Sequence, residues 1–146
     1  MSHIRSTTWL RLAVLYFILA VCIDIAMGAS GNHMLMPVHA HLNLLGWVSM
    51  TLFALIGHSH PAVHEGRVAS VQFWSYNIGV PIMLAALALR LNGIEAAEPA
   101  IGMASIAIGV GVVLFGWQVL TRTRTIQAAP PTALSAGITQ GVLASR

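Results

Sequence analysis

The stretch that decides the fold is HMLMPVHAHLNLLGWVSMTLFALIGHSH, residues 33–60. It carries histidines at both ends, and the apolar segment between His41 and His58 contains no charged residue. Because a helix rises about 1.5 Å per residue, these two histidines are expected roughly 25 Å apart. That separation is close to the thickness of a bilayer's hydrocarbon layer, about 30 Å. The stretch therefore predicts one membrane-spanning helix with histidine at each mouth.

The composition of the whole chain is that of a membrane protein. Its 146 residues are 57% hydrophobic and 8% charged, whereas soluble domains carry about 25% charged residues. The seven basic residues are all arginines, and they stand singly beside apolar segments rather than in a patch. This spacing argues against nucleic acid as a partner. One cysteine excludes an internal disulfide and the paired-cysteine motif that attaches haem covalently.

Hydropathy predicts an all-α fold class, an integral membrane four-helix bundle. The first span contains Asp24 and is longer than the apolar core of a signal peptide, so we expect it to be retained. After the last span the sequence is rich in Ala, Thr, Pro, Gly and Ser, which predicts a mobile cytoplasmic tail. The expected spans are residues 9–27, 38–57, 71–91 and 100–120, within one domain of residues 1–125, followed by the tail at residues 126–146.

Arginine placement predicts the orientation of the bundle. With four spans, five arginines fall on one side of the membrane. The opposite side carries Arg90, Glu95 and Glu98. The positive-inside rule then puts both termini in the cytoplasm, an N-in/C-in topology. We therefore expect a multi-pass protein of the bacterial inner (cytoplasmic) membrane. The arginines on the predicted cytoplasmic side are Arg5, Arg11, Arg67, Arg122 and Arg124.

The histidines at the predicted outer mouth are the strongest candidates for chemistry. His39 and His41 are two apart, so on a regular helix their side chains point about 200° from each other and cannot both ligate one metal. One of them is predicted to face the bundle. Imidazole is the usual axial ligand of b-type haem, and Gly46 would make room for a flat macrocycle, with Asn43 and Trp47 beside it. The alternative is a histidine that only hydrogen-bonds a neighbouring helix.

Asp24 is the second anomaly, because a carboxylate in a span costs about 2.5–3.5 kcal/mol unless it is paired. Arg90, at the outer end of the third span, lies at a similar predicted depth. An Asp24–Arg90 ion pair is one reading. In the others, Asp24 accepts the second N–H of a ligating histidine, or Arg90 contacts a haem propionate, with His33 as a further propionate contact.

A copper site is the alternative for the outer cluster. Met34 and Met36 precede Pro37, and His39 and His41 follow it. Thioether and imidazole ligands suit Cu(I) and Cu(II) respectively. At the inner mouth, His58, His60 and His64 are interpreted first as a hydrated loop. His58 alone is expected on the second helix, where it could bind a metal or a cofactor.

A spacing of seven separates Gly102, Gly109 and Gly116 in the fourth span. Small residues on one stripe let membrane helices approach closely. We expect this stripe to pack within the bundle rather than to form a dimer face.

At Pro37-Val38-His39-Ala40-His41-Leu42-Asn43-Leu44-Leu45-Gly46-Trp47 the sequence resembles the second helix of the haem–copper oxidase superfamily. The likeness is closest to the catalytic subunits of cbb3-type cytochrome oxidases and related nitric oxide reductases. It implies haem b, with His39 as the counterpart of the family's axial ligand and His41 one register step away. The family's second ligand and copper-centre histidines come from later helices that four spans do not provide. A complete oxygen or nitric oxide reductase site is therefore not expected.

The resulting hypothesis is a haem b-binding membrane protein that serves electron transfer, gas sensing or haem handling. Its alternatives are a copper-binding or copper-transport module and a cofactor-free accessory subunit of a respiratory complex. The expected partners are the lipid bilayer, and either further copies of the chain or respiratory-complex subunits.

Overall fold

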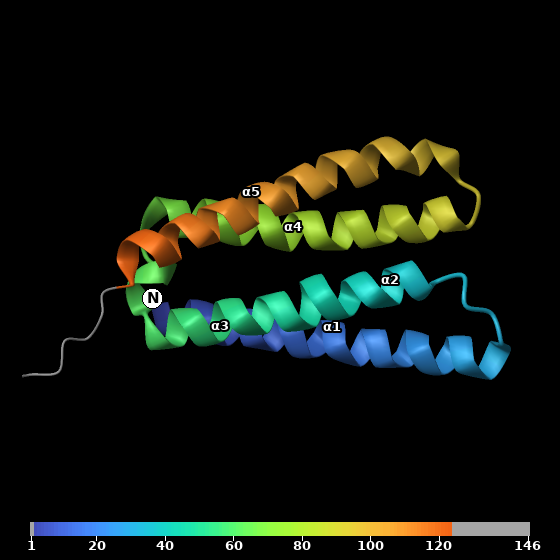
Figure 1. Cartoon of the computed structure of the whole chain (residues 1–146), viewed down its shortest axis with the longest axis horizontal. Helices are drawn as coiled ribbons and strands as arrows, with labels where there is room; N and C mark the ends of the chain where they lie inside the picture. The colour runs from blue at the N-terminus through green and yellow to red at the C-terminus, as the bar shows by residue number, and fades with distance from the viewer. Residues whose placement is uncertain (1, 124–146) are drawn as a thin grey trace, which may run out of the picture.

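The computed structural model describes residues 2–123, and in that range the chain is built of helices and short connections (Figure 1). Four helical segments are long and apolar enough to cross a membrane. The predicted all-α four-helix membrane bundle is thereby confirmed. The predicted tail at residues 126–146 lies outside the described residues. The four segments are Ile4–Ser30, Met36–Ser59, Gly66–Leu91 and Glu95–Arg122.

The second membrane crossing is not one uniform helix. It begins as α2 (Met36–His41), continues as the π-helical segment η1 (Leu42–Ser49) and ends as α3 (Met50–Ser59). In η1 the Ser49 hydroxyl donates to the carbonyl of Leu44, five residues back, at 2.8 Å. A π-helical segment shifts which side chains share a face, and such segments occur at functional sites.

The other elements are regular helices joined by short turns. A 3₁₀ turn, η2 (Pro61–His64), separates α3 from α4 (Gly66–Leu91). A second 3₁₀ turn, η3 (Glu95–Ala97), precedes α5 (Glu98–Arg122). The first helix, α1, covers Ser2–Ser30. Helices extend past the predicted spans because polar end turns continue the helix without adding hydropathy.

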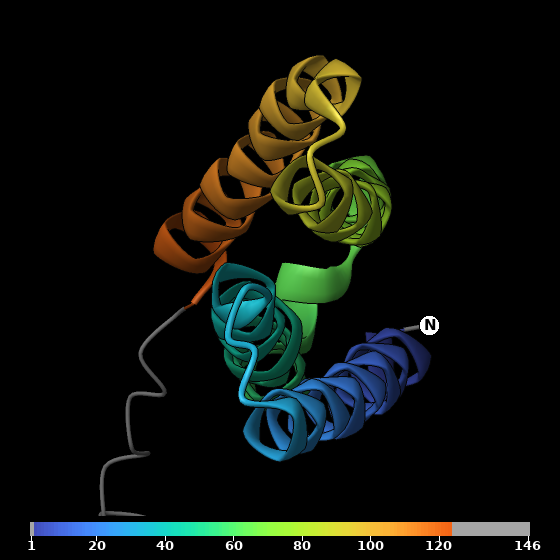
Figure 2. The same ribbon diagram turned by 90° about the vertical axis from the view of Figure 1, so that its right-hand side faces the viewer.

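The helices form two hairpins that lie side by side (Figures 1 and 2). In the first hairpin α1 packs against the second crossing, and in the second α4 packs along α5. We call the end that holds Ile4, Ser59, Gly66 and Arg122 the inner end. The outer end holds the connection at residues 31–35 and the turn at residues 92–94.

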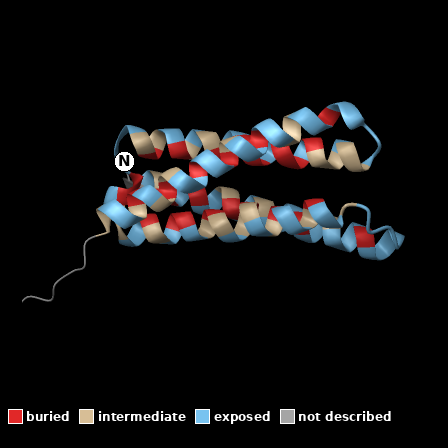
Figure 3. Cartoon of the chain, turned by 45° about the horizontal axis from the view of Figure 1, so that its top comes forward, coloured by how far each residue is buried: buried red, intermediate tan, exposed pale blue. Residues whose placement is uncertain are grey.

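Aromatic rings join the two hairpins in the inner half of the bundle. The Trp9 ring of α1 packs edge-on against Phe53 of α3 at 5.2 Å and against Phe73 and Tyr76 of α4 at 4.9 and 5.8 Å. Phe53 also meets Phe115 of α5 at 4.3 Å. Such ring pairs contribute about 0.5–1.5 kcal/mol each beyond their buried area. The buried residues lie on the sides of the helices that face one another (Figure 3).

Glycines set the closest helix contacts, but not those of the predicted stripe. A Cβ on Gly79 of α4 would lie 2.9 Å from Cγ1 of Ile108 on α5. A Cβ on Gly102, Gly109 or Gly116 would meet nothing within 4 Å. The stripe therefore points away from the bundle, and the prediction that it packs within the bundle was wrong. Helical period alone does not tell which face of an apolar helix meets its neighbours.

The outward faces of the helices are apolar. In the four candidate spans only 17–39% of the residues of the most apolar window are buried. Large side chains such as Met103 and Leu120 are 69% and 85% exposed. In water this surface would drive aggregation, whereas lipid chains accept it at no cost. The arrangement fits a multi-pass membrane protein in contact with the bilayer.

Candidate functional site at the outer end

His39 is directed into the bundle and both of its ring nitrogens are engaged. Its Nδ1 lies 3.0 Å from the carbonyl oxygen of Ala20 on α1. Its Nε2 lies 3.2 Å from Nδ2 of Asn43, one turn further along its own helix. An amide nitrogen only donates, so Nε2 accepts, and the proton of a neutral ring sits on Nδ1. His39 thus ties the second crossing to α1.

His41 has the opposite environment. The side chain is exposed, and its Nδ1 lies 2.7 Å from the carbonyl oxygen of Pro37, one turn back. A carbonyl only accepts, so Nδ1 carries the proton and Nε2 keeps its lone pair. Metal-ligating histidines are commonly oriented in this way, by a hydrogen bond from their second nitrogen to a backbone carbonyl. The two histidines therefore differ in use, as their spacing predicted.

The predicted pair of Asp24 and Arg90 does not form. Nε of Arg90 lies 3.2 Å from Oε2 of Glu98, which follows on α5. Asp24 is exposed on α1 and makes no hydrogen bond or ion pair with any residue of the described range. The sequence argument matched depths along the membrane, but the two residues belong to different hairpins. Asp24 orients neither histidine, since carbonyls of Ala20 and Pro37 take that role.

Gly46 provides room for a helix rather than for a macrocycle. A Cβ at Gly46 would lie 2.5 Å from both Cβ and Cγ of Tyr16 on α1. The next residue of α1, Phe17, stacks on Trp47 with ring centres 4.8 Å apart. The contact between α1 and η1 is therefore filled by side chains, and a flat cofactor does not fit inside it.

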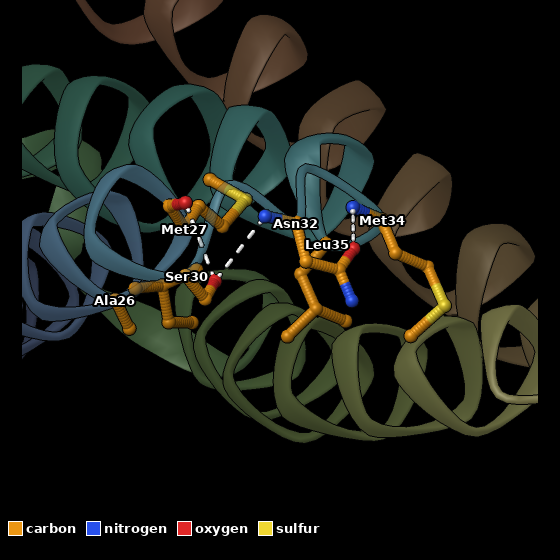
Figure 4. A pocket seen from close by; sticks show the side chains of 7 residues that line it. Ala26, Met27, Ser30, Asn32, Met34 and Leu35 are labelled. Carbon is orange, nitrogen blue, oxygen red and sulfur yellow. Dashed lines mark hydrogen bonds between the residues drawn. The ribbon is translucent and has the colours of Figure 1, made fainter.

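The loop at the outer end is held by its own hydrogen bonds. Ser30 Oγ accepts from the backbone N–H of Asn32 at 3.3 Å, and Asn32 Oδ1 accepts from that of Met34 at 3.0 Å (Figure 4). His33 Nδ1 lies 3.2 Å from the carbonyl of Gly31. A pocket of about 170 Å³ opens beside this loop. It is lined by Ile23, Ala26, Met27, Ser30, Asn32, Met34 and Leu35, and no histidine is among these residues.

The proposed copper ligands do not converge. His39 points to α1, His41 is exposed, and of the two methionines only Met34 lines the pocket while Met36 is exposed. Among residues 2–123 there is no group of three His, Cys, Asp or Glu side chains placed to hold a metal ion. This geometry gives the copper hypothesis no support from the outer cluster.

At the inner end, the interpretation of a hydrated histidine loop was wrong for His64. Its side chain is 2% exposed and its ring lies directly against Gly57. Burial lowers the pKa of His64, the nearby Arg5 charge lowers it further, and the Phe53 carbonyl opposes both effects. His58, by contrast, is exposed near the end of α3, as predicted for the helical member of the cluster.

Two arginines fasten the segment that buries His64. Arg5 Nη1 donates to the carbonyl of His64 at 2.9 Å, and its Nη2 donates to Ser70 Oγ at 3.0 Å. Arg122 Nη1 donates to the carbonyls of Ala62 and Glu65 at 3.0 and 2.6 Å. The turn thus links the first residues of α1 to the last turn of α5. From the sequence, both arginines predict only the orientation of the bundle and not these contacts.

Two amide side chains are buried at the inner end. Gln72 of α4 and Gln118 of α5 are completely buried. Both side-chain polar atoms of Gln72, and Oε1 of Gln118, have no hydrogen-bond partner in the described range. The signal was present as two uncharged polar residues inside apolar segments. The position of Gln72 at the start of a span indicates an interfacial residue, whereas the structure buries it completely.

No family model matches this sequence, and neither a curated protein nor a solved structure matches it. The functional argument therefore rests on the chemistry of the described residues and on the short likeness at residues 37–47.

Proposed function

We propose that the chain is a membrane haem protein that binds haem b at the outer end, with Nε2 of His41 as the axial ligand. The observation that carries the proposal is the Nδ1–Pro37 carbonyl hydrogen bond at 2.7 Å on an exposed ring. It fixes the tautomer and leaves a lone pair directed away from the bundle. This assignment moves the ligand from His39, which the family likeness favours, to its neighbour.

His39 supports the site without binding the cofactor. To ligate iron, its Nε2 would have to give up the hydrogen bond from Asn43. The ring would remain turned toward Ala20 of α1, where the filled contact at Gly46 and Tyr16 leaves no room for a macrocycle. His39 and Asn43 instead hold α2 against α1, so that His41 is presented at a fixed position on the outward surface.

One chain supplies one ligand by this account. If haem is bound, His41 would be the one residue of this chain that holds the iron, and the haem would supply gas binding or electron transfer. The proposed roles are therefore gas sensing, haem handling or electron transfer, the last requiring a second copy or a subunit of a respiratory complex. Asp24 is exposed near the outer end of α1, and the proposal does not need it as a hydrogen-bond partner of His41.

The test is the absorption spectrum of the full chain, purified in mild detergent after expression with added haem precursor. A Soret band with a reduced-minus-oxidised b-type spectrum supports the proposal. A folded protein without that band, confirmed as helical by circular dichroism, refutes it. Metal analysis of the same sample checks copper, because a stoichiometric copper content without haem would favour the Met34/Met36 alternative.

A further inference from the structure

Two adjoining hollows open on the outward surface of the inner end. The first, of about 280 Å³, lies between α1 and α3. The second, of about 270 Å³, lies along α1. Thr7 lines both, so the two hollows are neighbours, and we call them together the depression. The first is lined by Ser6, Thr7, Leu10, Ala54, Leu55 and His58, and the second by Ile4, Thr7, Thr8 and Arg11.

The lining is polar near the end of the bundle and apolar further in. Ser6, Thr7 and Thr8 lie in the first turns of α1, and His58 lies one residue before the end of α3. Leu10 and Leu55 each lie about one turn deeper along these helices, and both are exposed. Among the polar side chains, the Thr8 hydroxyl already donates to the carbonyl of Ile4 at 2.8 Å. A molecule seated here would meet polar side chains at one end and methyl groups at the other. Such a molecule is amphipathic and enters from the bilayer.

Arg11 gives this depression its charge. The side chain is exposed and makes no hydrogen bond or ion pair with any residue between 4 and 123. At the same end, the guanidinium groups of Arg5 and Arg122 already donate hydrogen bonds within the protein. Arg5 donates to a backbone carbonyl and to the Ser70 hydroxyl, and Arg122 donates to two backbone carbonyls. Arg11 lies seven residues inside Ile4, roughly 10 Å along the helix. A cation at that depth is costly unless an anion pairs with it or it reaches the headgroup layer.

We propose that this depression binds one anionic phospholipid. Arg11 pairs with the phosphodiester, which a guanidinium can contact through two parallel hydrogen bonds. An acyl chain lies over the exposed side chains of Leu10 and Leu55. Basic pockets at the ends of membrane helices on the cytoplasmic side bind such headgroups, in line with the orientation expected from the arginines. The proposal is independent of haem.

The experiment is native mass spectrometry of the full chain in detergent, titrated with phosphatidylglycerol or with phosphatidylcholine of the same acyl chains. We expect one phosphatidylglycerol bound at least about tenfold more tightly than phosphatidylcholine, because only the former retains net negative charge. Arg11→Gln should remove most of that preference. Arg67→Gln is the matched control, since it makes the same charge change on an exposed arginine outside both hollows.

Arg11→Lys keeps the charge but loses the two parallel hydrogen bonds of a guanidinium. It should weaken phosphatidylglycerol binding severalfold and serves if Arg11→Gln fails to fold. Equal binding of the two lipids would overturn the proposal, and so would equal losses in Arg11→Gln and Arg67→Gln, which indicate diffuse attraction. Displacement of the lipid by inorganic phosphate at about 10 mM would also overturn it, because the acyl chain would then contribute nothing.

Discussion

His39 and His41 stand two residues apart, yet their Nδ1 atoms bond to carbonyls of different helices. His39 reaches Ala20 of α1 at 3.0 Å, and His41 reaches Pro37 of its own helix at 2.7 Å. One histidine is thereby committed to the fold, and the other presents Nε2 outward. The account of the site depends on this division.

The first prediction concerns His39 as a structural residue. His39→Ala removes the bond to Ala20 and the acceptor of Asn43, so unfolding free energy should fall by about 1–2 kcal/mol. The measurement is denaturant or thermal unfolding in detergent followed by circular dichroism. Asn43→Ala should cost less, because it leaves the contact with α1 in place. An unchanged midpoint in His39→Ala would show that the link between the helices contributes nothing.

Gly46→Ala should destabilise the first hairpin. The new methyl would lie 2.5 Å from Cβ and Cγ of Tyr16, and forced overpacking costs about 1–3 kcal/mol. Gly109→Ala is the matched control, since its methyl would meet nothing within 4 Å and alanine is the better helix former. We expect a lower unfolding midpoint for the first variant and an equal or higher one for the second. Equal midpoints would contradict the close contact of η1 with α1.

The buried His64 predicts a pH dependence of stability. Burial holds its folded-state pKa below the ordinary value of 6.5, so the unfolded chain binds the proton more readily. The folded chain therefore has its full stability, as far as His64 is concerned, above about pH 7. That stability declines as the pH falls through 6.5 toward the pKa of His64 in the folded state. Unfolding midpoints measured from pH 8 to pH 5 should therefore fall more steeply in the wild type than in His64→Gln.

The other histidines titrate in both proteins, so the difference between them isolates His64. Parallel profiles for the wild type and His64→Gln would mean that this ring is reached by water in the folded protein.

Gln72 offers a test of the inner core. Neither polar atom of its buried amide has a partner in the described range, and an unsatisfied buried group costs about 1–3 kcal/mol. Gln72→Met has a similar shape and no such cost, so its unfolding free energy should rise by about 1 kcal/mol. Marked destabilisation instead would show that the amide holds a bound molecule.

Much of the fold could be predicted from the sequence, for a physical reason. A bilayer demands long apolar helices, so residues 9–27 and 38–57 were recognisable as spans by length and hydropathy alone. Orientation followed from the arginines in the same way, although it stays a prediction. Which face of each helix meets its neighbours could not be read, because every face is apolar. The glycine stripe of the fourth span was misassigned for that reason.

The site was harder to predict because its chemistry depends on single backbone carbonyls. The spacing predicts that the side chains of His39 and His41 point in different directions. It does not predict which of the two points toward α1. The choice depends on where Ala20 presents its carbonyl. The pairing of Arg90 with Glu98 rather than Asp24 similarly depends on which helices form a hairpin. The sequence predicts only the depth of each residue in the membrane, and depth does not distinguish Glu98 from Asp24 as the partner of Arg90.

The most direct test of the central claim compares the Soret absorbance per protein of His41→Ala and His39→Ala, both expressed with added haem precursor and purified folded. The account predicts that His41→Ala loses the band, whereas His39→Ala retains most of it despite lower stability. Loss of the band in His39→Ala with full retention in His41→Ala would contradict the assignment and return the ligand to the position that the family likeness suggests.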